Sequence, residues 1–195
     1  MARVRTEDKT DVILEAALRR FLHYGLKKTS MQEVARDAGV GVGTLYLYFK
    51  DKDALVAGCA ERFAVQHRAD AEALLGSRKR SDKKLEEYLL HRYRVWQEVG
   101  LRAPGALELA EAILRLRPDK VTEGADELIR NLRAILTDGK ASGVFPRVNP
   151  ERDARVLALS IMGFFPIAGR EPPVQVGEAE FSLVIEWFIK RFKEA

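Results

Sequence analysis

The sequence predicts an all-α protein of nine helices. Apolar residues recur at intervals of three and four along almost every long segment of the 195 residues, which is the spacing of one face of an α-helix. Glycine or proline separates these segments, and nowhere do several alternating β-branched runs follow one another. Helices joined by turns are therefore expected throughout the chain.

Capping signals delimit the N-terminal helices. Gly25 supplies the left-handed residue that follows the end of the first helix. Ser30 and Glu33 form a capping box, in which each side chain satisfies a backbone donor of the other residue, so a second helix begins here. Asp51 is expected to cap the fourth helix. The four helices are expected at about 8–24, 30–39, 42–49 and 51–75.

Proline marks the start of several later helices. Pro104, Pro118 and Pro150 each stand where the first helical turn tolerates proline, and Asn149 is expected to cap the helix that begins at Pro150. The polar stretch 76–84, rich in lysine and arginine, is interpreted as a solvated loop. The five later helices are expected at about 84–99, 104–116, 118–140, 150–165 and 177–193.

Composition indicates the class of protein. Hydrophobic residues make up 47% of the chain and charged residues 32%, which is typical of a globular protein. Cys59 is the single cysteine, so a disulfide within the protomer is excluded. There is no apolar run long enough to span a bilayer, so a cytoplasmic protein without a membrane segment is expected. The net charge of +4 favours polyanions only weakly.

Two short helices joined by a glycine-containing turn match a helix-turn-helix in length and pattern. Gly39 takes the left-handed turn, Val40 fills the corner and Leu45 anchors the second helix, whose other face stays exposed. This pattern places a DNA-binding domain in residues 1–55 and a second helical domain in residues 56–195.

The exposed face of the second short helix offers groups that suit DNA. Gly43 lets the backbone approach a sugar-phosphate strand, while Thr44 and the tyrosine hydroxyls can donate to phosphates. Val42 or Thr44 could touch a thymine methyl group. Lys52 follows as a further contact for an anion.

From Ile13 to Leu55, and above all in AGVGVGTLYLYFKDK at 38–52, the chain resembles the DNA-binding domain of the TetR family of one-component transcriptional regulators. The resemblance implies that Ser30 and Gln32 meet phosphate. It implies that the recognition helix and the lysine after it meet DNA through Val42, Gly43, Thr44, Tyr46, Tyr48 and Lys52. One departure is Gly41, which stands where many members have a serine and offers no side-chain oxygen to cap the helix. Val42 is apolar where a polar residue that contacts a base is common. DNA shape is therefore expected to contribute more to the discrimination between DNA sequences.

The last two helices are strongly apolar and are expected to pair with a second copy of the chain. Such two-fold pairing would set two recognition helices about 34 Å apart on a palindromic operator. The family resemblance also implies dimerisation through these helices. The expected interface residues are Leu157, Ile161, Phe164, Val184, Trp187 and Phe188.

A ligand pocket is the second expectation for the C-terminal region. Tyr93 and Trp96, with Leu107 on the following helix, could line a pocket for an aromatic ligand, although such stripes are ordinary core by default. A buried Glu108 or Glu111 could pair with a cationic ligand; otherwise both are solvated.

These observations together predict a homodimeric regulator, in which an unknown small-molecule effector releases the protein from double-stranded DNA. The alternative is a helix-turn-helix protein with an architectural or cell-division role and no ligand sensing. An enzyme is not expected, because the sequence holds no nucleophile–base pair and no phosphate loop. No cofactor or metal is expected, since the three histidines lie far apart in sequence. Cys59 is interpreted as an inert packed thiol.

Overall fold

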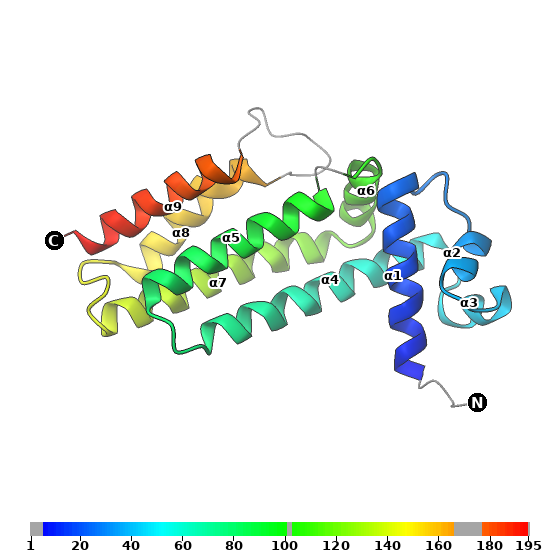
Figure 1. The fold of residues 1–195 in the computed structure, drawn as a ribbon, viewed down its shortest axis with the longest axis horizontal. Helices are drawn as coiled ribbons and strands as arrows, with labels where there is room; N and C mark the ends of the chain where they lie inside the picture. The colour runs from blue at the N-terminus through cyan, green and yellow to red at the C-terminus, as the bar shows by residue number, and fades with distance from the viewer. Residues whose placement is uncertain (1–5, 101–102, 166–176, 195) are drawn as a thin grey trace. The chain divides into compact units, whose positions relative to one another are not determined.

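The computed structural model describes residues 6–100, 103–165 and 177–194. Within these ranges the regular structure is helical, which confirms the all-α prediction (Figure 1). The elements are α1 (Thr6–Tyr24), α2 (Met31–Asp37), α3 (Val42–Tyr48), α4 (Lys52–Leu75), α5 (Ser81–Gly100), α6 (Ala106–Leu116), α7 (Pro118–Ala141), α8 (Pro150–Ile161), one 3-10 turn (Met162–Phe164) and α9 (Glu178–Lys193).

The helices divide between two compact units. The first comprises residues 1–65 and 99–121, and the second comprises residues 66–98 and 122–195. In the first unit α1 packs against α2 and α6, and α2 packs against α3. The first unit therefore includes α6, whereas the sequence-based boundary after residue 55 assigned this helix to the C-terminal domain.

The predicted helix ends are confirmed where local side chains define them. The Ser30–Glu33 capping box is present at the start of α2. A carboxylate oxygen of Asp51 accepts a hydrogen bond from the Ala54 amide (2.8 Å), and Asn149 likewise caps α8. Gly25 has a φ of 88°, so it adopts the left-handed conformation expected after α1.

Helix α5 begins at Ser81, three residues before the predicted start. Two buried side chains hold this first turn: the Ser81 hydroxyl donates to Asp138 (2.8 Å), and the Asp82 carboxylate accepts from Arg80 and Lys193. Lys84, interpreted as solvated, is also buried, and its ammonium donates to the carbonyl of Leu75 (3.0 Å). The loop interpretation was wrong for residues 81–84, because Asp138, Lys193 and Leu75 contact them from other helices.

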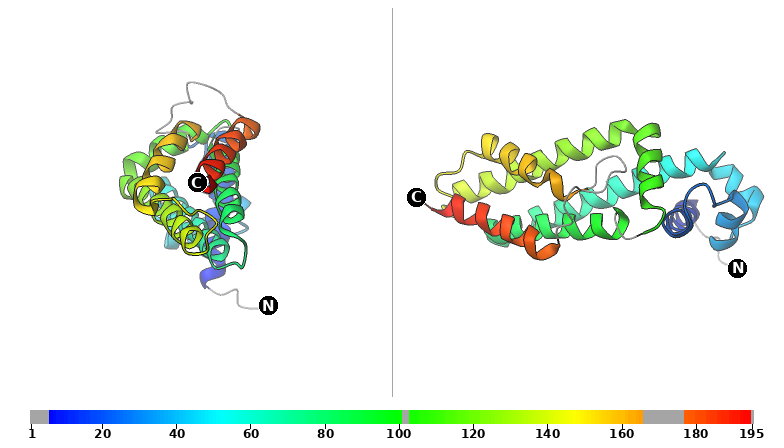
Figure 2. Two further views of the ribbon diagram at one scale, coloured as in Figure 1. Left: turned by 90° about the vertical axis from the view of Figure 1, so that its left-hand side faces the viewer. Right: turned by 90° about the horizontal axis from the view of Figure 1, so that it is seen from above.

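The core of the second unit combines side chains of α5, α7, α8 and α9. Helices α5 and α9 lie side by side (Figure 2), and the Tyr93 and Phe181 rings stack between them at 4.8 Å. Helix α8 ends at Ile161 and continues as a single 3-10 turn, so it is shorter than the predicted 150–165.

Candidate functional site

Helices α2 and α3 form the helix-turn-helix that the sequence predicts. Gly39 has a φ of 67°, and the Val40 amide donates to the carbonyl of Ala35 (3.0 Å), which closes the turn. Ala35 and Leu45 are fully buried where the two helices meet. The opposite face of α3 is left without a partner inside the first unit.

The predicted DNA-contacting residues fall into two groups. Val42, Gly43 and Tyr46 are exposed on α3, and Gln32 is exposed on α2. Thr44 and Tyr48 are half-buried on the flank of the same helix, together with Ser30 and Lys52 at other helix ends. Gly41 caps α3 without a side-chain hydrogen bond, as the sequence predicts.

Two of the half-buried residues already have partners within the first unit. The Ser30 hydroxyl is hydrogen-bonded to the Glu33 carboxylate at 2.8 Å. The Lys52 ammonium donates to the carbonyl of Leu26 at 2.9 Å. An ammonium has three donors, so Lys52 can hold this turn and still approach an anion.

The turn between α1 and α2 is also held by α6. The Glu108 carboxylate accepts hydrogen bonds from the backbone amides of Leu26 (2.7 Å) and Lys27 (3.2 Å). The interpretation of Glu108 as solvated or ligand-binding was therefore wrong. The Leu26 peptide is fixed from both sides, because its amide donates to Glu108 and its carbonyl accepts from Lys52.

Arg20 joins α1 to α2 by two ion pairs. Its guanidinium lies 2.9 Å from a carboxylate oxygen of Glu33 and 2.7 Å from one of Asp37. The hydrogen bond from Arg20 holds the pKa of the Asp37 carboxyl below its usual range, so both partners stay charged. This clamp fixes the angle at which α2 leaves α1.

Exposed cations surround the helix-turn-helix, and sequence reasoning did not single them out as contacts. They stand in the α1–α2 turn, on α2 and after α3, and are Lys27, Lys28, Arg36 and Lys50. Their exposure beside the helix-turn-helix is what makes them candidate contacts, and exposure is not visible in a single sequence.

Residues 13–59, which contain this arrangement, match the family model "Bacterial regulatory proteins, tetR family". This helix-turn-helix segment is therefore of the tetR type. The chain is 48% identical over 48 residues to the uncharacterized HTH-type transcriptional regulator YhgD of Bacillus subtilis (strain 168). That match covers 25% of each chain, so the matched part of this chain spans about a quarter of the length of this curated relative.

Other matches cover more of the chain. The fatty acid metabolism regulator protein of Bacillus subtilis (strain 168) is 26% identical over 152 residues, which is 77% of this chain and 76% of that protein. A transcriptional regulator from Cytophaga hutchinsonii ATCC 33406 has the same fold, with a TM-score of 0.73 and 23% identity over 95% of this chain and 99% of that chain. The SmeT–triclosan complex has a TM-score of 0.67 at 19% identity, over 94% of this chain and 90% of that chain.

The four predicted pocket residues divide between the two units. Tyr93 is buried and Trp96 is half-buried on α5, and both contact aromatic rings of the second unit: Tyr93 stacks on Phe181, and Trp96 meets Phe165 at 6.4 Å. Leu107 is half-buried and Glu111 is exposed on α6 in the first unit. A pocket shared by all four stays a prediction.

A cluster that sequence reasoning missed lies in the second unit around Arg92. The guanidinium lies 5.7 Å from the centroid of the Phe165 ring, and its buried Nε donates to no acceptor in the described part of the protein. None of the ion pairs between described residues includes Arg92. Beside it, the buried Tyr88 hydroxyl is hydrogen-bonded to Asn131 (3.2 Å). A half-buried cation without a counter-ion is costly, so this cluster suits an anion.

His67 in the same cluster makes folding pH-dependent. Burial, and then the charge of Arg92, lower the pKa of His67 from 6.5 to about 4. Between these two pH values, His67 is therefore protonated in the unfolded chain and neutral in the folded chain. Above pH 6.5, protonation of His67 is expected to take nothing from the free energy of unfolding. As the pH drops from 6.5 to 4, this free energy is expected to fall by about 3 kcal/mol.

Urea unfolding at a series of pH values measures this effect. The His67→Gln variant is expected to lose that part of the pH dependence, while the contribution of the carboxylates remains. If the free energy of unfolding depends on pH in the same way in the parent and in His67→Gln, the role of His67 is contradicted.

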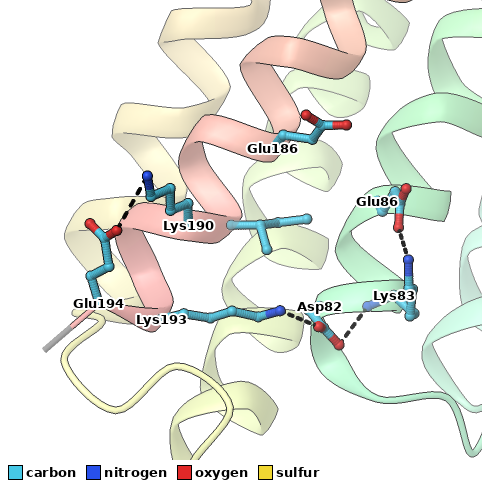
Figure 3. Close-up of a pocket in the computed structure, with 8 residues that line it drawn as sticks. Asp82, Lys83, Glu86, Glu186, Lys190, Lys193 and Glu194 are labelled. Atoms are coloured by element: carbon cyan, nitrogen blue, oxygen red, sulfur yellow. Dashed lines mark hydrogen bonds and ion pairs between the residues drawn. The ribbon is translucent and has the colours of Figure 1, made fainter.

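A shallow groove of about 410 Å³ lies between α5 and α9 (Figure 3). Its charged side chains largely pair with one another, as Lys193 does with Asp82 and Lys83 with Glu86. None of the predicted pocket residues lines it. The lining residues are Asp82, Lys83, Glu86, Glu186, Ile189, Lys190, Lys193 and Glu194. Because most of its charges are paired within the protein, the groove does not indicate a ligand class.

The predicted dimer interface is corrected by burial. Leu157 and Ile161 are fully buried in the protomer core and Phe188 is buried as well, so they offer no surface to a second chain. Phe164 and Val184 are half-buried. The large apolar side chains that are exposed on α8, the 3-10 turn and α9 form what we call the exposed apolar strip: Val156, Leu159, Met162, Leu183 and Trp187. Trp187 alone belongs to the predicted set.

Three further features concern Cys59, metal ions and membranes. Burial raises the pKa of the Cys59 thiol to about 12, which makes it the inert thiol that was expected. Among the described residues, no group of three histidine, cysteine, aspartate or glutamate side chains could hold a metal ion. No helix in the described ranges combines the length and apolar character needed to cross a membrane.

Proposed function

We propose that this protein is a ligand-responsive transcriptional regulator, a repressor that binds a palindromic DNA operator as a dimer. The observation that carries this proposal is the helix-turn-helix with its unpartnered α3 face, within a tetR-family match at residues 13–59. The exposed cations around it would bind phosphates. A protein that acts on bacterial chromosomal DNA works in the cytoplasm, and regulation rather than catalysis is its role.

Selection from a random pool of DNA duplexes, at near-physiological salt, tests the proposal. Enrichment of a palindrome with half-sites one helical turn apart is the expected result. Salt-sensitive binding without enrichment would favour the architectural alternative. Absence of binding to any duplex would overturn both.

Tyr48 and Lys52 are expected to contribute to affinity for all sequences alike. Tyr48→Phe removes one hydroxyl donor and should weaken binding about tenfold without changing the salt dependence. Lys52→Gln should also weaken binding, and should reduce the log–log salt slope by about 0.9 for each phosphate that the lysine no longer neutralises. Fluorescence anisotropy over a salt series measures both effects. Lys140→Gln, at an exposed position on α7, is the matched control. Unchanged affinity in both site variants would contradict the assignment.

Dimerisation would use the exposed apolar strip. Leu183 and Trp187 are 64% and 61% exposed and stand one turn apart on α9, while Leu159 on α8 is 68% exposed. Because a monomer gains nothing from leaving these side chains in water, a second copy of the chain is the proposed cover.

The effector would be an anion with an apolar body, bound at Arg92. The guanidinium supplies the charge, Tyr88 and Asn131 supply polar contacts, and Phe165 with Trp96 supplies apolar surface. Two similar proteins carry names from fatty-acid metabolism, and a third is solved with triclosan. These names are compatible with an amphipathic effector.

Release of the selected operator tests the effector class. Carboxylates with apolar chains of increasing length are expected to release DNA, whereas the corresponding amines and alcohols are not. Arg92→Gln should retain DNA binding and lose the response, and Arg130→Gln, at an exposed site on α7, should retain both. A response by Arg92→Gln equal to that of the parent would overturn the role of Arg92. A failure of every compound would favour the alternative without ligand sensing.

A further inference from the structure

The exposed face of α3 carries no charged side chain and is apolar except for the hydroxyl of Tyr46. At about 100° per residue, Val42, Tyr46, Gly43 and Leu47 follow one another across an arc of about 140°, with the buried Leu45 outside it. Leu47 is 85% exposed, more than any other large apolar side chain in the described part of the protein. One exposed leucine needs no explanation. Here, however, it shares a face with an exposed valine and an exposed tyrosine.

Helix α3 also lacks the side chains that commonly recognise bases. Its seven residues, VGTLYLY, include no arginine, lysine, amide or carboxylate. The bidentate hydrogen bonds that identify guanine or adenine, and the carboxylate contact to cytosine, therefore cannot come from this helix. In the major groove, the remaining feature that an aliphatic side chain can distinguish is the C5-methyl group of thymine.

We propose that α3 recognises thymine C5-methyl groups through Leu47 and Val42. The DNA half-site then carries thymine, or 5-methylcytosine, which presents the same methyl group, where these two side chains touch it. Gly43 lies between them on the helix surface and has no side chain to hold the backbone away from the groove. This inference rests on the proposed function and names the chemistry by which that function selects its DNA.

Replacing single thymines of the selected operator with deoxyuridine removes only the methyl group. At one or two positions per half-site, the substitution is expected to weaken binding about fourfold. This factor corresponds to about 0.8 kcal/mol, the free energy of burying one methylene group. Leu47→Ala should weaken binding to the unmodified operator and should abolish the sensitivity to deoxyuridine at one of these positions. Val42→Ala should abolish it at another. At a sensitive position, 5-methylcytosine should bind more tightly than cytosine.

A matched control is Val65→Ala, at an exposed aliphatic site on α4, which should leave binding and deoxyuridine sensitivity unchanged. If the operator is bound but no deoxyuridine substitution changes the affinity, the inference fails and the proposed function stands. Strictly additive effects of Leu47→Ala and deoxyuridine at every position would likewise overturn the role of Leu47. If no duplex is bound at all, the proposed function itself fails.

Discussion

Gly105→Ala is expected to destabilise the first unit by about 3 kcal/mol, a large effect for the addition of one methyl group. A β-carbon at this position would lie 1.8 Å from the carbonyl oxygen of Phe21 and 2.9 Å from backbone atoms of Gly25. Both neighbours are main chain at the end of α1, so neither can rotate away. The Gly105 amide also donates to the carbonyl of Leu22 (2.8 Å), which fixes the close approach of the two segments.

The measurement is urea unfolding followed by circular dichroism. Gly124→Ala is the control, because a β-carbon there meets nothing within 4 Å on α7. That change should stabilise the protein by about 0.5–1 kcal/mol, since alanine is the better helix former. Equal urea midpoints for Gly105→Ala and the parent would show that α6 can move away from α1 without loss of stability.

Local chemistry explains what the sequence could predict. The Ser30–Glu33 box, the Asn149 cap and the left-handed Gly39 each depend on residues within a few positions, so a single sequence contains all of their determinants. The helix-turn-helix is likewise a local pattern, and its two helices and turn form as predicted, although Thr44 and Tyr48 are half-buried rather than exposed.

Contacts between distant segments explain what the sequence could not predict. Glu108 binds the amide of Leu26 across 82 positions, and nothing near Glu108 distinguishes it from Glu111, which is exposed. Arg92 resembles any other arginine on an amphipathic helix until the residues around it are known.

Leu157, Ile161 and Phe188 were wrongly predicted as interface residues for a related reason. Helix α9 is apolar on most of its surface, and periodicity alone does not separate the side that meets the protomer core from the side that meets water. Phe188 and Trp187 are neighbours in sequence, yet Phe188 is buried and Trp187 is exposed. A glutamate at Phe188 would therefore test folding rather than association.

Leu183→Glu combined with Trp187→Glu is expected to convert the proposed dimer to monomers without unfolding the chain. Both side chains are exposed in the protomer, so the substitutions cost little there. In a two-fold interface each change occurs twice, which removes four apolar side chains and brings like charges together. Sedimentation velocity measures the oligomeric state, and the helical circular dichroism signal checks the fold. The monomer should also bind the full operator much more weakly, because it engages one half-site at a time.

Val65→Glu introduces the same charge at an exposed aliphatic site outside the strip and should leave the dimer intact. If the double variant still sediments as a dimer, the exposed apolar strip is not the interface, and the two half-sites must be joined by another surface. If it is monomeric but binds the operator as tightly as the parent, pairing of the recognition helices does not depend on association in solution. A monomer with weakened operator binding is the one result in which the strip both joins the two copies and sets the spacing of their α3 helices.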